Sequence, residues 1–164
     1  MTEAKIVELV VTEQHPAHHA RRSAAQIADL RAIPDTNVDI SAALTPAGPP
    51  AQIIRALQQG QFELITSGEL LSEIGETLAR DKLAHQLTAA DRQSMINLAG
   101  RRARVVPDRA VDHGDVPGDA DDDYLVALAR EWHAALVTGD HHLLDLPGMP
   151  AIMTPRRFLN LLEA

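Results

Sequence analysis

The chain has 164 residues, a formal net charge of −8 at pH 7 and no cysteine. This length predicts one globular domain with a true hydrophobic core. The lack of cysteine excludes disulfides, thiolate metal sites and cysteine nucleophiles, so any metal must be held by oxygen or imidazole ligands. No apolar run approaches the roughly 20 residues that span a bilayer, and the first thirty residues lack a secretory pattern, so we expect a cytoplasmic protein without membrane segments.

The charged residues are distributed unevenly. Six of the 23 acidic residues fall between Asp112 and Asp123, whereas arginines cluster at positions 101–104 and 156–157. Net negative charge argues against a polyanionic substrate. An acidic cluster that binds a divalent cation reverses the local field, however, so a phosphate substrate is still compatible with this composition.

The first half of the chain predicts strands and helices in alternation. Residues 30–33 form a short apolar run that ends at Asp35, and Gly48-Pro49-Pro50 opens a helix that closes at Gly60. Phe62 to Thr66 is typical of a strand. Ser67 caps the next helix, which runs to Arg80 and carries one apolar stripe, made of Leu70, Leu71, Ile74 and Leu78.

The second half continues this alternation. Thr88 with Asp91 starts a further helix. The remaining predicted elements are a strand at 103–106, a loop at 107–119, a helix at 124–133, a strand at 135–138, a strand at 151–153 and a last helix capped by Thr154, with Pro155 first. Short apolar strands between helices predict the α/β class, here a three-layer α/β/α sandwich with a central parallel sheet. We assign this domain to residues 31–164 and treat residues 1–30 as an N-terminal extension to which the sequence assigns no role.

Acidic residues recur where this topology places one edge of the sheet. Ligands of such sheets bind at the carboxyl ends of the strands. Asp35 follows the first core strand, Asp140 follows the strand at 135–138, and Asp119 and Asp121–Asp123 immediately precede a predicted helix. Glu73 lies about 60° from Leu70 on a helical wheel, at the border of the buried stripe, so its carboxylate is expected to face a cleft.

Convergent carboxylates are the ligands that Mg²⁺ and Mn²⁺ prefer. Such ions activate water and neutralise charge on a phosphoryl group, so the pattern favours metal-dependent phosphodiester hydrolysis. Each residue also has a structural interpretation: Asp119–Asp123 as helix caps, Asp35 and Asp140 as turn residues, and Glu73 as a solvated boundary residue.

Taken together, the ordered blocks resemble the PIN-domain family, most closely the bacterial PIN-like toxins related to VapC. The resemblance spans about Ala32 to Leu162. It rests on Asp35-Thr36-Asn37-Val38, Ser41-Ala42, Gly48-Pro49-Pro50-Ala51, Phe62-Glu63-Leu64, Ser67 with Glu73, Asp119, Asp121-Asp122-Asp123-Tyr124-Leu125, Leu136-Val137-Thr138-Gly139-Asp140, Leu143-Leu144 and Thr154-Pro155-Arg156-Arg157-Phe158-Leu159.

The resemblance implies an Mg²⁺- or Mn²⁺-dependent endoribonuclease that is inhibited by a cognate antitoxin protein and often forms a homodimer. By resemblance, the catalytic carboxylates and metal ligands would be Asp35, Glu73, Asp123 and Asp140. Asp122 and Asp119 would be additional ligands, and Asn37 and Thr138 would orient the carboxylates by hydrogen bonding.

The chain departs from the family pattern at Pro34 and Asp39, where the family usually has apolar residues. A phosphatase with an aspartyl nucleophile would carry a second acid where Asn37 stands, and a receiver domain needs a lysine after a late strand, which this chain lacks. The main alternative is therefore a catalytically inactive PIN-like module that binds RNA or protein.

Overall fold

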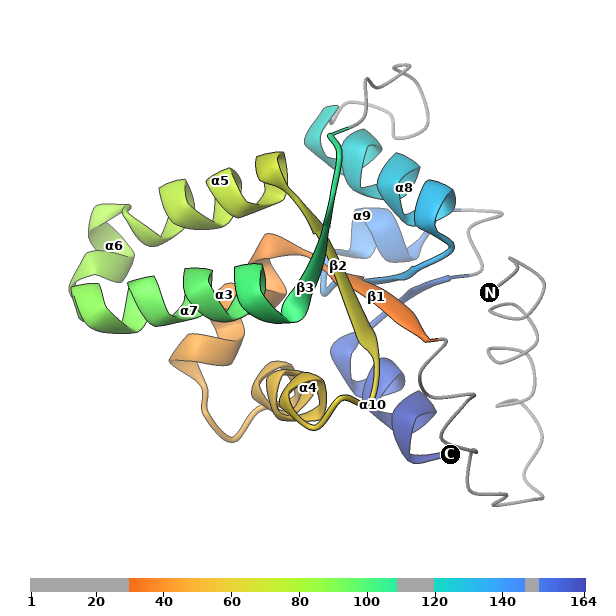
Figure 1. Cartoon of the computed structure of the whole chain (residues 1–164), viewed down its shortest axis with the longest axis horizontal. Helices are drawn as coiled ribbons and strands as arrows, with labels where there is room; N and C mark the ends of the chain where they lie inside the picture. Colours follow the sequence, from red (N-terminus) through yellow and green to blue (C-terminus); the bar gives the residue numbers. More distant parts are fainter. Residues whose placement is uncertain (1–29, 109–119, 147–150) are drawn as a thin grey trace.

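The computed structural model describes residues 30–108, 120–146 and 151–164 (Figure 1). The strands in this part of the chain are β1 (Arg31–Pro34), β2 (Glu63–Ser67), β3 (Ala103–Val106), β4 (Ala135–Val137) and β5 (Ile152–Met153). The helices are α3 (Thr36–Leu44), α4 (Pro49–Gln58), α5 (Gly68–Leu78), α6 (Asp81–Ala84), α7 (Ala89–Arg102), α8 (Ala120–Trp132), α9 (His141–Leu144) and α10 (Pro155–Glu163).

The five strands form one parallel sheet in the order β3-β2-β1-β4-β5. β1 lies in the middle, with Ala32 opposite Leu64 of β2 on one side and opposite Ala135 of β4 on the other. Because all strands run the same way, their carboxyl ends meet at a single edge, which we call the carboxyl edge. The segments that leave β1, β2 and β4 begin there.

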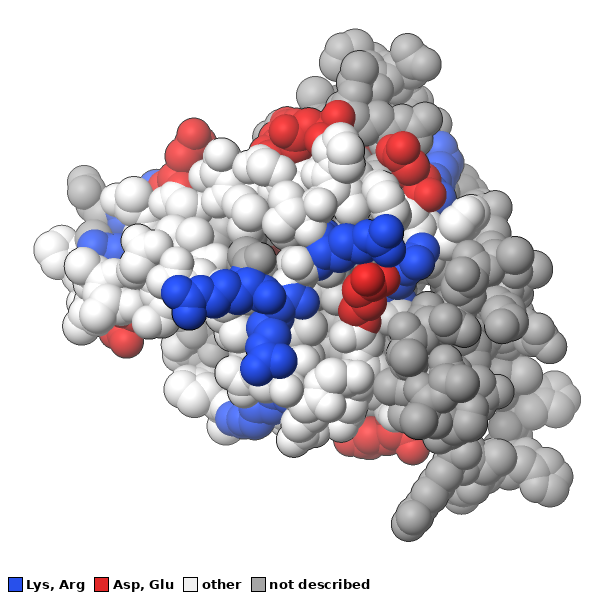
Figure 2. Space-filling view, viewed as in Figure 1, with Lys and Arg blue, Asp and Glu red and all other residues white. Residues whose placement is uncertain are grey.

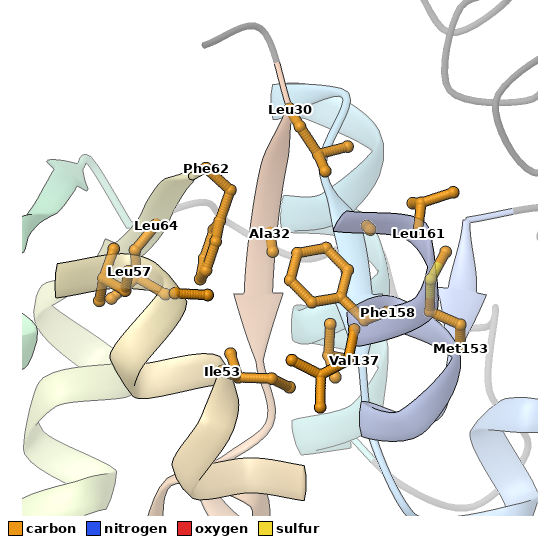
Figure 3. Packing of buried hydrophobic residues seen from close by; sticks show 13 residues of the cluster. Leu30, Ala32, Ile53, Leu57, Phe62, Leu64, Val137, Met153, Phe158 and Leu161 are labelled. Carbon is orange, nitrogen blue, oxygen red and sulfur yellow. The ribbon is translucent and has the colours of Figure 1, made fainter. Parts of the chain in front are cut away.

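Alternate strand residues point into two apolar layers. One layer packs β1, β2, β4 and β5 residues against α4 and α10, and at its centre Phe62 and Phe158 meet edge to face, with ring centres 5.1 Å apart (Figure 3). The other layer packs Ile33, Ile65 and Leu136 against α8 and α9. The predicted three-layer α/β/α sandwich with a central parallel sheet is confirmed.

Capping residues fix several boundaries that the sequence predicts. Ser67 Oγ accepts a hydrogen bond from the Leu70 amide at the start of α5, and Thr154 Oγ1 caps α10 in the same way. Thr88 and Asp91 bond to each other's side chains and amides before α7. Gly60 follows α4 with a φ of +70°, a backbone conformation that glycine adopts without strain.

Three helices were not predicted and a fourth begins earlier than predicted; of the three, α6 and α9 are only four residues long. α3 was not predicted, because its buried residues Thr36, Val38 and Ile40 alternate along the chain and show no helical stripe. α8 begins at Ala120, four residues earlier than predicted, so Asp121–Asp123 lie inside its first turn and do not precede it. Acidic residues are favoured in the first turn because they complement the positive end of the helix dipole.

In the described ranges, none of the helices combines the length and apolar character that crossing a membrane requires.

Candidate active site

Asp35 is the first residue after β1 and is held from several sides. Its backbone amide donates to the carbonyl of Val137 at 2.9 Å, which extends the β1–β4 ladder by one bond. Its carboxylate accepts the Asn37 amide at 3.4 Å and thereby caps α3. Only 8% of Asp35 is exposed, so this carboxylate is buried at the carboxyl edge. The Asn37 side chain is exposed, and the contact that reaches Asp35 comes from its backbone.

Thr138 joins Asp35 to Asp140 across the neighbouring strands β1 and β4. The fully buried Thr138 hydroxyl donates to Asp35 Oδ2 at 2.9 Å and accepts the Asp140 amide at 3.0 Å. Asp140 Oδ1 accepts the His142 amide at 2.8 Å and caps α9. One hydroxyl therefore fixes the orientation of the first acid and the backbone of the second, and both acids cap a helix, where the structural interpretation expected turn residues.

Asp39 brings a further carboxylate close to Asp35. It lies one helical turn along α3 and is partly buried. Burial, and then repulsion by the Asp35 carboxylate, raise its pKa from 3.8 to about 8. In the described part of the chain, neither Asp35 nor Asp39 forms an ion pair with lysine or arginine. Two carboxyl groups therefore lie close together at the end of β1, and among the described residues no lysine or arginine pairs with either of them.

The other predicted acids are on helices. Asp123 lies in the first turn of α8 and is only 4% exposed, and Asp122 beside it is partly buried. Glu73 lies on α5 and is partly buried next to the apolar stripe that contains Leu70 and Ile74, as the helical wheel predicted. Asp119 and the side chain of Asp121 lie outside the described residues.

The carboxylate oxygens of these acids are the ligands that a hard divalent cation prefers, and the acids lie at or near one edge of the sheet. Their spacing is wider than that of a formed metal site: within the described ranges, no three Asp, Glu or His side chains are grouped closely enough to hold an ion. The structure thus links Asp35 and Asp140 through Thr138, and does not gather the four predicted ligands into one cluster.

A second polar network lies on the same edge and was not predicted. The Tyr124 hydroxyl on α8 lies 2.5 Å from Ser67 Oγ and donates to Asp108 Oδ1 at 3.0 Å. Asp108 follows β3 and also accepts the Glu69 amide at 2.9 Å. This backbone bond is the main cause of the lowered pKa of Asp108, and burial is the main cause of the raised pKa of Tyr124, about 12. Asp108 could have been found in the sequence as the first acid after the strand at 103–106.

Comparison with known proteins gives the family. A profile of the PIN domain matches residues 31–142, from the start of β1 to just beyond Asp140. This chain belongs to the PIN-domain family. The matched range contains Asp35, Glu73, Asp123 and Asp140 and excludes the N-terminal thirty residues. Proteins of the PIN-domain family are generally nucleases, so nuclease chemistry is the activity to test at the carboxyl edge.

Two proteins resemble this PIN domain over most of their length. The uncharacterized protein MJ1680 of Methanocaldococcus jannaschii is 31% identical over 117 residues, which cover 71% of this chain and 75% of that protein. The crystal structure of PAE2754 from Pyrobaculum aerophilum superposes with a TM-score of 0.59 at 19% identity, covering 84% of this chain and 92% of the other. The structural likeness supports the fold, and the family rests on the profile match over residues 31–142.

Proposed function

We propose that this PIN domain is an Mg²⁺- or Mn²⁺-dependent endoribonuclease that hydrolyses RNA phosphodiester bonds. The observation that carries the proposal is the buried Asp35 carboxylate at the carboxyl edge, which is bonded to Thr138 and repels Asp39. A buried carboxylate with a second one nearby and no neighbouring lysine or arginine is costly unless a cation or a proton compensates it. A divalent cation would be that compensation.

Asp35, Asp140, Asp123 and Glu73 would hold the cation, with Asp122 and Asp119 as additional ligands. When bound, the cation would supply a water of lowered pKa and would neutralise charge on the phosphoryl oxygens. Thr138 keeps one Asp35 oxygen occupied, so the carboxylate presents a fixed orientation. The caps formed by Asp35 and Asp140 hold both backbones at the strand ends.

The decisive experiment follows cleavage of RNA by the full chain with Mg²⁺, with Mn²⁺ and with EDTA. We expect products only with metal, and we expect Asp35→Asn to reduce the rate by more than about a hundredfold, because several kcal/mol of charge stabilisation depend on the ion. On α5, Glu73→Gln should reduce the rate, whereas the exposed Glu76→Gln on the same helix is the matched control and should not. Equal cleavage in EDTA would refute metal dependence.

A second candidate function is an inactive PIN-like module that binds RNA or protein. The wide spacing of the described carboxylates favours it, because a metal site of three side chains is not formed among them. This alternative predicts association that is insensitive to metal and yields no products. Millimolar Mg²⁺ or Mn²⁺ would then leave the melting temperature unchanged, whereas a cation that binds the folded state raises it.

A narrower proposal concerns the biological role. The resemblance to VapC-like toxins supports a cytoplasmic toxin of a type II toxin–antitoxin pair, active as a homodimer and inhibited by a cognate antitoxin. Expression in a bacterial host should then arrest growth, and Asp35→Asn should remove the arrest at equal protein level. Light scattering should give twice the 17.8 kDa chain mass. If the protein is monomeric and does not arrest growth but still cleaves RNA, the toxin role is refuted and the nuclease proposal stands.

A further inference from the structure

The amino ends of β1, β2 and β3 carry a charged surface that the proposed chemistry does not use. Arg31 and Glu63 are the first residues of β1 and β2 and pair in register, and Arg104 lies beside them on β3. The last two residues of α7, Arg101 and Arg102, are exposed and lead directly into β3. Figure 2 shows blue side chains gathered across the middle of this face, with several red ones along the upper rim, towards the carboxyl edge.

Two of these arginines are held in place by the protein. Arg31 Nε lies 2.9 Å from Glu63, and its Nη1 donates to the carbonyl of Trp132 at 3.3 Å. Arg104 lies 3.7 Å from Glu63 and its guanidinium packs 5.1 Å from the centre of the Trp132 ring. Arg104 nevertheless keeps 48% of its side chain exposed. A guanidinium that is already oriented loses less entropy when it binds a phosphate.

The path from these arginines to the candidate active site runs along β3. β3 is an edge strand of the described sheet, and Val105 on it is 53% exposed. Asp108 at the carboxyl edge is the fourth residue after Arg104, which corresponds to roughly 13 Å of extended chain. RNA laid along β3 would therefore run from the arginines to the carboxyl edge, where Asp35 lies two strands further across the sheet.

We propose that Arg101, Arg102, Arg104 and Arg31 form a binding surface for the phosphate backbone of the RNA substrate, at the opposite end of the strands from the candidate active site. This inference rests on the proposed nuclease function and names the surface that holds the rest of the substrate. The protein as a whole carries a net charge of −8, so phosphate attraction must be local. Among described residues only Leu44 and Val105 are large exposed hydrophobics, so beside the arginines β3 offers one exposed valine and no cluster of the apolar anchors that a protein interface needs.

The test measures binding of a labelled single-stranded RNA of about 16 nucleotides in EDTA, by fluorescence anisotropy at several salt concentrations. Arg101→Gln/Arg102→Gln removes two guanidiniums that make no hydrogen bond or ion pair within the described chain. We expect Kd to rise roughly ten- to thirtyfold at about 0.1 M salt, and the log–log salt slope to fall by about 1.4.

Arg80→Gln/Lys82→Gln is the matched control, because both residues are exposed near α6 and the change in net charge is the same. It should leave Kd within about twofold if binding is local. Glu63→Gln should tighten binding, because it removes the carboxylate that competes with phosphate for Arg31 and Arg104. Equal weakening by both double variants, or by neither, would overturn the proposal.

Binding in EDTA is independent of cleavage, so the two proposals fail separately. If the wild type binds RNA through these arginines but yields no products with Mg²⁺ or Mn²⁺, the binding surface stands and the nuclease proposal is refuted. Cleavage with an unchanged KM in Arg101→Gln/Arg102→Gln would keep the nuclease and refute the surface. Failure of wild type to bind RNA, with arginine-dependent binding of an acidic peptide instead, would reassign the surface to a protein partner and overturn the RNA proposal.

Discussion

The carboxyl edge has two halves that are built differently. In the β1–β4 half, the Thr138 hydroxyl connects two acids, Asp35 and Asp140, and Asp35 is buried. In the β2–β3 half, the Tyr124 hydroxyl connects the buried Ser67 to a single acid, Asp108, which is exposed. The carboxylate of Asp35 in the first half is therefore buried, whereas the carboxylate of Asp108 in the second half is exposed to water.

This difference separates a chemical task from a structural one. A buried carboxylate is costly and persists where a cation can compensate it, so the β1–β4 half is suited to metal binding. An exposed carboxylate that accepts a backbone amide and a phenol costs little and ties α8 to the first turn of α5. We therefore expect variants of the first half to change activity, and variants of the second half to change mainly the free energy of unfolding.

Among the variants that test this contrast between the two halves, the largest effect is expected from Thr138→Val, which keeps the shape of the side chain and removes its hydroxyl. Asp35 loses a buried hydrogen bond, so cleavage should fall about 10- to 100-fold and the free energy of unfolding by about 1–3 kcal/mol. The readout that separates positioning from simple destabilisation is the Mg²⁺ concentration for half-maximal rate, which should rise.

Thr138→Ser is the control, because it restores the hydroxyl that Asp35 and Asp140 share. Its rate and metal dependence should return close to those of wild type. If Thr138→Val loses stability while its metal dependence stays unchanged, the β1–β4 half is structural and the contrast between the halves disappears.

A smaller effect is expected from Asp39→Asn. The pKa of Asp39 is about 8 in the folded protein and 3.8 in the reference state, so folding favours the protonated form. The wild type should therefore lose stability as pH rises from about 4 to 8, and this loss should level off above pH 8. Asparagine does not titrate, so the variant should gain about 1–2 kcal/mol on wild type between pH 5 and 8, after allowance for its partial exposure.

The measurement is the difference in melting temperature between Asp39→Asn and wild type at pH 5 and at pH 8, in EDTA. The gain at pH 8 should be roughly 2–8 °C larger for a chain of this size. The same difference at both pH values would show that Asp39 does not titrate in this range and that charge does not accumulate beside Asp35.

Much of the fold could be predicted because its signals are local. Gly48-Pro49-Pro50, Ser67 and Thr154 mark helix starts through backbone geometry and capping, which depend on a few adjacent residues. α3 could not be predicted because its buried residues do not repeat with a helical period. That helix depends on packing against α4 and α5, and such contacts are absent from a short window of sequence.

The positions of two candidate site residues were predictable for a similar reason. Asp35 follows β1 directly and Asp140 lies three residues after β4, so topology alone brings both to one edge. The roles of Tyr124 and Asp108 depend on how α8 approaches β3, which the sequence does not encode locally. The start of α8 was misplaced because three consecutive aspartates have low helix propensity but are favoured in a first turn.

The smallest effect is expected in the second half, from Tyr124→Phe. The single hydroxyl proton of Tyr124 is donated to Asp108, so the Ser67 hydroxyl donates its own proton to the Tyr124 oxygen. Phenylalanine removes that oxygen and leaves the buried Ser67 hydroxyl without this acceptor. The free energy of unfolding should fall by about 1 kcal/mol, and the cleavage rate should change by less than about threefold. In a Ser67→Ala background, which has no proton to leave unpaired, the same substitution should cost less, and a double-mutant cycle in denaturant measures the difference. A large loss of cleavage with normal stability would instead place Tyr124 in the active site and make the two halves chemically equivalent.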